Sequence, residues 1–90
     1  MSALLKQHFG ANLRSLRVSD GISQEELGFR ASLHRTEVSE LERSIRLPKL
    51  DAILKLAAAL SVPPGELIGG MAWVSGVFES SEARTGEDSS

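Results

Sequence analysis

Residues 23–44, SQEELGFRASLHRTEVSELERS, constrain the fold of this chain more than any other segment. Ser23 can accept a hydrogen bond from the backbone N–H of Glu26, and the Glu26 carboxylate can reach back to the N–H of Ser23. This reciprocal arrangement is a capping box, which fixes where a helix begins. Leu27 and Ala31 then follow at helical spacing. The segment therefore predicts a short helix that begins directly after Ser23.

A second helix is predicted after a break at Ser32 and Leu33, and it begins near His34 or Arg35. The 3.6-residue period places three residues on its inner side: Val38, Leu41 and Glu42. Its outer side carries only polar residues: Arg35, Thr36, Ser39, Glu40 and Arg43. Two short helices with a tight turn and a polar second helix have the layout of a DNA-reading helix-turn-helix. A helix that packs only for stability can also have a polar outer face, so this pattern alone leaves both interpretations open.

Further helices are predicted on either side of this segment. Apolar residues at helical spacing predict a helix over residues 2–19, which Asp20 and Gly21 end, and another after residue 49. Pro64 fits the first turn of a short fifth helix. The inward-facing residues predicted for these three helices are Leu5, Phe9, Leu13, Leu16, Leu50, Ile53, Leu54, Ala57, Leu60, Leu67 and Ile68. The sequence thus predicts an all-α domain of five helices around one apolar core.

These signals occur in a familiar order: SQEEL, RTEVSELER, a short basic loop with Pro48, and LDAILKLAAALSVPPGEL. Over about residues 9–68 the chain resembles the phage repressor and Cro helix-turn-helix family, often called Xre-like. The resemblance implies a five-helix Cro/repressor-like domain that regulates transcription by sequence-specific DNA binding. Because one recognition helix covers only a few base pairs, we expect a homodimer on a palindromic operator.

The resemblance also implies which residues contact DNA. It places Arg35, Thr36 and Glu40 at base edges, where Arg suits guanine, Thr suits thymine and Glu suits the cytosine amine. It places Gln24 at a phosphate, at the N-terminus of the first helix of the motif. The other candidate backbone contacts are His34, Ser39, Arg43, Ser44 and Arg46. The alternative for Glu37 and Glu40 is that they are solvated surface charges, or acids that repel wrong sequences.

Arg17 and Glu42 match a structural pair of the same family. In the family, an Arg four residues before the glycine that closes the first helix pairs with a Glu near the end of the recognition helix. Arg17 and Gly21 have that spacing. Glu42 falls on the inner side of its helix, where an unpaired carboxylate would be costly. The pair is therefore predicted to brace the recognition helix, and the alternative is two unrelated surface charges.

Two serines replace glycines that are usual in the family. Ser32 stands in the turn of the motif, and Ser44 follows the recognition helix. If either residue adopts a positive φ, the cost is roughly 1 kcal/mol. These departures affect stability more than DNA chemistry.

Charge is unevenly distributed along the chain. Although the net charge is −2, residues 1–50 hold 8 basic and 6 acidic side chains, whereas residues 51–90 hold 2 basic and 6 acidic. The basic excess thus coincides with the predicted DNA-binding face, and local sign matters more than the total for steering DNA.

The composition excludes several other classes of site. There is no cysteine, the two histidines are isolated, and no catalytic or phosphate-loop motif occurs. We expect neither an enzyme, a metal site nor a cofactor. No apolar run is long enough to cross a membrane and no signal-peptide pattern is present, so we expect a cytoplasmic, nucleoid-associated protein.

The resemblance ends near residue 70, which bounds a predicted DNA-binding domain of residues 1–70. Residues 71–79 form an apolar extension that can pair as two strands around Ser75 and Gly76. Because a lone pair of strands is marginally stable, the extension is predicted to pack on the helices or on a second copy. The candidate dimer contacts are Leu67, Ile68, Met71, Trp73, Val74, Val77 and Phe78. Residues 80–90 are polar and acidic, and a disordered tail is predicted there.

A second function class remains open on sequence alone. The chain could be an interaction module, such as a DNA-binding antitoxin or an adaptor whose C-terminal segment binds another protein. The C-terminal sequence does not distinguish this class from a transcription regulator.

Overall fold

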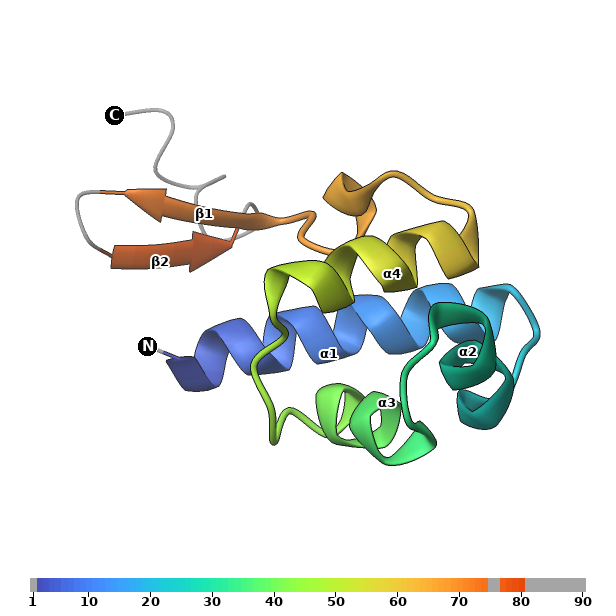
Figure 1. Cartoon of the computed structure of the whole chain (residues 1–90). Coiled ribbons are helices and arrows are strands. Elements are labelled where there is room, and N and C mark those ends of the chain that lie inside the picture. Colours follow the sequence, from blue (N-terminus) through green and yellow to red (C-terminus); the bar gives the residue numbers. More distant parts are fainter. Residues whose placement is uncertain (1, 75–76, 81–90) are drawn as a thin grey trace.

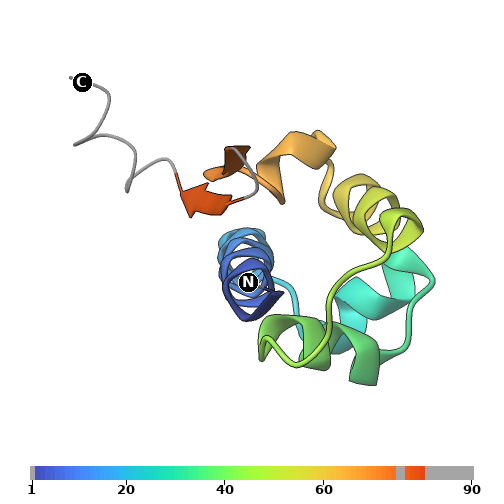
Figure 2. The same cartoon turned by 90° about the vertical axis from the view of Figure 1, so that its left-hand side faces the viewer.

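The computed structural model describes residues 2–74 and 77–80. Its elements are α1 (Ser2–Ser19), α2 (Gln24–Ala31), α3 (Arg35–Glu42), α4 (Leu50–Leu60), the 3-10 helix η1 (Pro64–Glu66), and the strands β1 (Met71–Val74) and β2 (Val77–Ser80). Figure 1 shows α1 as the longest element; α3 packs against α1, and α2 packs against both α3 and α4, so α4 lies on the far side of the domain from α1 (Figure 2). The fold is therefore a helical domain followed by two short strands.

Local sequence signals set the ends of the first two helices. Gly21 closes α1 with a positive φ of 74°, which a residue without Cβ adopts without strain. The Ser23 hydroxyl accepts from the backbone N–H of Glu26 at 3.0 Å and so caps α2. The Glu26 carboxylate instead accepts from Arg30 one turn further on. The cap therefore starts the helix as predicted, although the acid serves an ion pair within the helix.

The core lies where the helices meet. Viewed along α1, the other helices curve around its inner side (Figure 2). The largest fully buried side chains come from different elements: Leu13, Leu27, Val38, Leu41, Leu56 and Leu67. Burial of each contributes about 1.5–3 kcal/mol. Because this core takes two residues from α3, the orientation of α3 depends on the whole domain.

The buried face of α4 differs from the predicted one. Leu50 and Leu54 were predicted to face inward, but they are 74% and 51% exposed. Ala52 and Leu56 are buried instead, together with Ala57 and Leu60 as predicted. The sequence LDAILKLAAAL is apolar nearly all round, so its periodicity cannot fix which side meets the core. Two large apolar side chains, Leu50 and Leu54, therefore lie on the surface.

The described residues contain four α-helices rather than the predicted five. The fifth is the single 3-10 turn η1, in which the N–H of Leu67 donates to the carbonyl of Pro64 at 3.0 Å. Leu67 is fully buried as predicted, whereas Ile68 was predicted to face inward and is 46% exposed. Asn12 holds this turn against α1 by donating to the carbonyls of Leu67 and Gly69.

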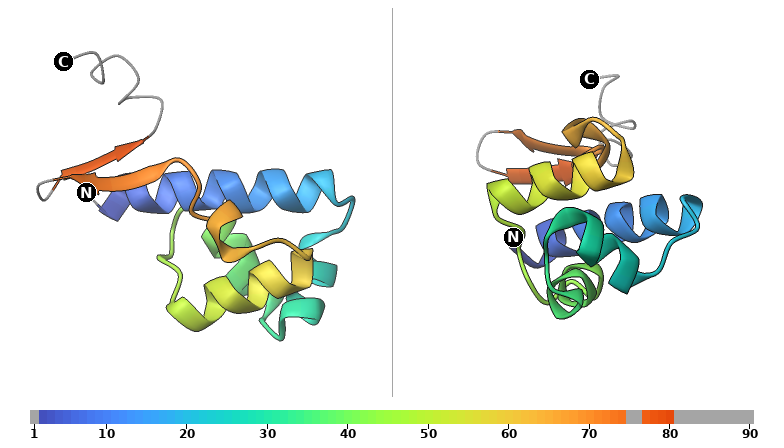
Figure 3. Two further views of the ribbon diagram at one scale, coloured as in Figure 1. Left: turned by 90° about the horizontal axis from the view of Figure 1, so that it is seen from above. Right: turned by 45° about the vertical axis from the view of Figure 1, so that its right-hand side comes forward.

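The two strands lie near the N-terminal end of α1 and project beyond the helices (Figures 1 and 3). They pair antiparallel, with Met71 opposite Ser80 and Val74 opposite Val77. Met71 packs against the core. Ser80, which was assigned to the predicted tail, is instead the last residue of β2. Residues 81–90, the rest of that predicted tail, lie outside the described residues.

Candidate nucleic-acid interface

The turn between α2 and α3 depends on one serine and one glycine. Ser32 adopts the left-handed conformation, with φ 57° and ψ 40°, and turns the chain out of α2. Leu33 then donates its N–H to the carbonyl of Gly28 at 2.8 Å. A Cβ on Gly28 would lie 2.8 Å from the carbonyl oxygen of Leu33, so no side chain fits there. Ser32 thus adopts the backbone conformation that is expected for a glycine at this position of the turn.

The close approach of α1 to α3 was not foreseen from sequence. A Cβ on Gly10 would lie 2.6 Å from the carbonyl oxygen of Leu41 and 3.0 Å from that of Glu42. Gly10 therefore lets the end of α3 contact the backbone of α1. A glycine inside a helix costs roughly 0.5–1 kcal/mol of stability relative to alanine. A glycine within a predicted helix is therefore the sequence signal for such a close approach.

The α3 helix presents the two faces that its period predicts. Val38 and Leu41 are fully buried, whereas Arg35, Thr36 and Arg43 are exposed. A polar hollow of about 220 Å³ opens on the outer side. Its lining residues were all predicted to contact DNA: Gln24, Arg35, Thr36, Ser39 and Arg43. The fold thus brings candidates from the starts of α2 and α3 together on one surface.

The predicted brace is present as an ion pair. Arg17 Nε and Nη2 donate to the two carboxylate oxygens of Glu42 at 2.5 and 3.0 Å, and the side chains are only 13% and 3% exposed. Arg17 Nη1 also donates to the carbonyl of Ile22 at 2.8 Å. The hydrogen bond to Glu42 raises the pKa of Arg17. The pair therefore joins the end of α1 to the end of α3.

Gln24 belongs to the same network. Its amide donates to Glu42 Oε1 at 3.1 Å, although the family resemblance placed this amide at a phosphate. Because an amide nitrogen carries two hydrogens, one donor can hold Glu42 while the other faces the hollow. The start of α2 is thus tied to α3 by a side chain that also lines the predicted DNA surface.

The remaining candidates surround the C-terminal end and the start of α3. Arg43 donates to the hydroxyl of Ser39 at 3.2 Å, and His34 is exposed at the N-cap position. Ser44 has a φ of 65°, again the conformation usual for glycine. Arg46 donates to Glu40, so two residues predicted as separate DNA contacts are paired with each other.

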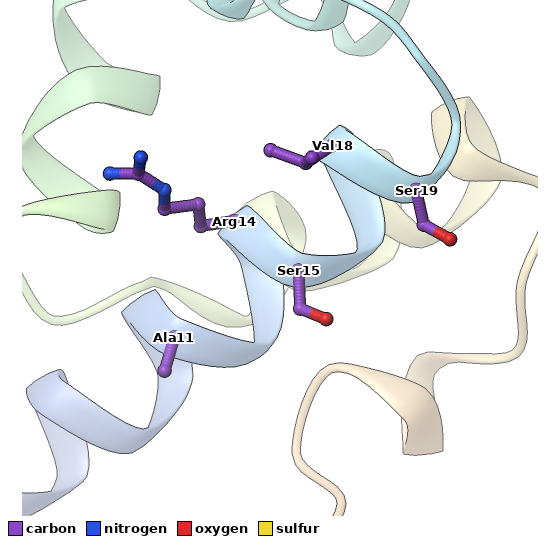
Figure 4. Close-up of a pocket in the computed structure, with 5 residues that line it drawn as sticks. All are labelled: Ala11, Arg14, Ser15, Val18 and Ser19. Carbon is purple, nitrogen blue, oxygen red and sulfur yellow. The ribbon is translucent and has the colours of Figure 1, made fainter.

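Another hollow, of about 530 Å³, lies along α1 (Figure 4). Its lining residues come from one face of that helix: Ala11, Arg14, Ser15, Val18 and Ser19. None of them was predicted to contact DNA.

The described residues contain no cluster of acids and histidines that could hold a metal. They also contain no helix with the length and hydropathy of a membrane span. The hollow whose lining residues were all predicted to contact DNA lies beside α3, so the candidate site is the surface around α3.

Comparison with known proteins identifies the family. A helix-turn-helix family model matches residues 13–67, which include α2, α3 and α4. The chain belongs to the helix-turn-helix family. It is thus a DNA-binding transcription regulator of the Xre-like type, as the resemblance predicted, and not an enzyme.

The relatives include several controller proteins. The control protein C.BamHI of Bacillus amyloliquefaciens is 44% identical over 61 residues, which are 67% of this chain and 75% of that protein. The control protein C.SmaI of Serratia marcescens is 34% identical over 64 residues, 71% of this chain and 76% of that protein. The crystal structure of the restriction-modification controller protein C.AhdI from Aeromonas hydrophila has a TM-score of 0.68 at 47% identity, covering 69% of this chain and 94% of that one.

Proposed function

We propose that this helix-turn-helix regulator controls a restriction-modification system by binding a palindromic operator as a homodimer. The observation that carries the proposal is the polar hollow beside α3, which brings together five predicted DNA contacts. The similarity to controller proteins, C.AhdI among them, supports the choice of regulated system. Its site of action is then DNA in the cytoplasm.

Three residues of α3 are proposed to read bases. Arg35 and Thr36 are exposed in the first turn of α3, and Glu40 follows one turn later. Arg can donate two bonds to guanine, Thr can contact the thymine methyl group, and Glu can accept from the cytosine amine. The first turn of a recognition helix is the part that reaches base edges, which agrees with the positions of Arg35 and Thr36.

Backbone contacts are proposed around these base readers. Gln24 and the N-terminus of α2 face the hollow, where backbone N–H groups favour a phosphate. Arg43 lies at the opposite end of α3, and its bond to Ser39 leaves it exposed. The other proposed contacts are His34, Ser39, Ser44 and Arg46. Phosphate contacts of this kind position the protein without reading sequence.

A dimer surface is proposed on the side of α4 and the residues after η1. Leu47, Leu50, Leu54 and Ile68 are each at least 46% exposed. An apolar hollow of about 180 Å³ adjoins them, lined in part by Leu47, Ile68 and Met71. Leu67 was also predicted as a dimer contact, but it is fully buried and can only support the surface from below. Exposed apolar patches mark interaction surfaces, and we assign this one to a second copy of the chain because the proposed operator-binding form is a homodimer.

The C-terminal strands are proposed to add to this surface. Met71 packs against the core and begins β1, so the strands leave the domain beside the apolar hollow. The side chains of the other candidates, Trp73, Val74, Val77 and Phe78, lie outside the described part of the structure. Two strands alone are marginally stable in water, and a second copy would supply the missing cover.

Truncation after Gly70 tests this part of the proposal. We expect the shortened chain to remain helical, because η1 and Leu67 stay in place, but to dissociate at micromolar concentration. Sedimentation equilibrium and circular dichroism measure the two properties, with a chain ending at Ser80 as the control. A shortened chain that dimerises as strongly as the control would show that the strands contribute nothing to the dimer.

Footprinting on the DNA upstream of the protein's own gene tests the proposed function. We expect two protected half-sites about one helical turn apart, roughly 34 Å. We also expect genes for a restriction enzyme and a methyltransferase beside it. A single protected half-site would contradict the dimer, and neighbours of another kind would contradict the assignment to restriction-modification control. We do not extend the proposal to a toxin or adaptor partner, because the relatives named above are controllers.

A further inference from the structure

An ion pair lies at the C-terminal end of the predicted DNA-binding face. Arg46 Nη2 and Nε both donate to Glu40 Oε1, at 2.6 and 2.9 Å. The Glu40 side chain is 26% exposed and that of Arg46 is 46% exposed. Both groups are therefore accessible to DNA, yet in the free protein each is held by the other.

The backbone places Arg46 over Glu40. The chain leaves α3 through Ser44, whose φ of 65° reverses its direction. The N–H of Ile45 then donates to the carbonyl of Glu40 at 3.0 Å. The loop is thus tied to residue 40 through the main chain as well as through the side chain. Arg46 is positioned by the fold and does not extend freely into solvent.

Electrostatics give this pair a consequence for DNA binding. An acid on the recognition helix repels phosphates and base acceptors unless a donor meets it. Arg46 neutralises Glu40, so the two together present almost no net charge to the DNA backbone. Arg43 differs, because its hydrogen-bond partner is the neutral hydroxyl of Ser39. The positive charge of Arg43 is therefore available to a phosphate, whereas that of Arg46 is neutralised by Glu40.

We propose that the Glu40–Arg46 pair is a specificity filter within the DNA-binding site. The pair holds Glu40 so that its carboxylate accepts from a cytosine amine at the matching base pair. At guanine and thymine Glu40 instead faces acceptor atoms, and Arg46, which stays occupied by Glu40, makes no phosphate contact that would offset this repulsion. Non-cognate DNA thus gains no phosphate contact from Arg46 in either protomer. This inference rests on the proposed function, because it assigns roles within the same site.

The test is a double-mutant cycle on two kinds of duplex: the operator obtained by selection, and a pool of random sequence. Glu40→Gln removes the charge that holds Arg46 and leaves a side chain of similar size that both donates and accepts. We expect tighter binding to the random pool and a smaller preference for the operator. A new phosphate contact steepens the salt dependence by about 0.9 per protomer, so the affinity ratio between 50 and 200 mM salt should rise about 3.5-fold per protomer, or about 12-fold for the dimer.

Arg46→Gln then identifies the origin of that gain. In the Glu40→Gln background, Arg46→Gln should abolish the added salt dependence. In the wild-type background, it should lower the affinity for both duplexes, because it leaves the charge of Glu40 uncompensated. Arg43→Gln is the matched control. It should reduce the salt slope by about 0.9 per protomer in both backgrounds, since Arg43 is not paired with Glu40.

The outcomes separate the filter from the function on which it rests. If the wild-type protein prefers the operator but Glu40→Gln leaves random binding and its salt slope unchanged, the filter is wrong and the proposed function stands. Additive effects of Glu40→Gln and Arg46→Gln would overturn the filter in the same way. If the wild-type protein shows no preference for any duplex, both proposals fail. Thermal melting of each variant controls for loss of fold.

Discussion

Replacing Arg17 with alanine is expected to destabilise the domain by about 3–5 kcal/mol, because it leaves a buried carboxylate without its cation. The Glu42 side chain is 3% exposed, and Arg17 supplies two of the bonds to it. Domains of this kind have only about 5–15 kcal/mol of total stability. The melting temperature measured by circular dichroism should therefore fall sharply.

Arg14→Ala is the matched control for this substitution. Arg14 lies one turn earlier on α1, is exposed, and extends away from the helix on the surface shown in Figure 4. Its removal should change the melting temperature little. Equal, small shifts for both variants would show that the ion pair does not brace the domain.

The loss of Arg17 should also weaken DNA binding. Glu42 accepts from both Arg17 and Gln24, so it joins α1, α3 and the start of α2. Without Arg17, the end of α3 loses its ion pair to α1, so its orientation is held less firmly although Val38 and Leu41 stay packed in the core. Binding should therefore weaken on every duplex, even at a temperature where the variant remains folded.

Replacing Arg35 with alanine is expected to have the largest effect on sequence preference. Arg35 is exposed in the first turn of α3 and lines the polar hollow. The loss of a bidentate contact to guanine should cost about 1–3 kcal/mol per half-site and relax the preference at that base pair. Titration of the variant against the operator and against single-base variants of it measures both effects.

Arg43→Ala provides the contrast, because Arg43 is proposed to contact a phosphate. It should weaken binding to all sequences alike and flatten the salt dependence by about one unit of slope per half-site. If Arg35→Ala also weakens all sequences equally, then Arg35 is a backbone contact. If neither variant differs from wild type, α3 is not the recognition helix.

Local patterns in the sequence were enough to place the motif. The serine cap fixed the start of α2, and the 3.6-residue period separated Val38 and Leu41 from the polar outer face. The family resemblance implied the pairing of Arg17 with Glu42, and the inward position of Glu42 agreed with it, because a buried carboxylate needs a cation. For the cap and for the two faces of α3, a single strong preference, unopposed by its neighbours, determines the local structure.

Other features depend on tertiary packing that no local pattern encodes. Leu50 and Leu54 are exposed because α4 has apolar residues on every side, and its contacts alone decide which side is buried. Ile68 was misplaced because the fifth helix is only a 3-10 turn, which shifts the direction of each following side chain. The pairing of Glu40 with Arg46 depends on the reversal at Ser44, which was predicted only as a departure from glycine.

Selection of bound sequences from a pool of random duplex DNA tests the central claim most directly. The claim is that α3 reads DNA as one half of a symmetric pair. We predict enrichment of a palindrome whose half-sites lie about one helical turn apart, with a guanine and a cytosine at fixed positions in each half-site. A pool that stays random after repeated selection, or one that converges on a single unrepeated half-site, would contradict the claim.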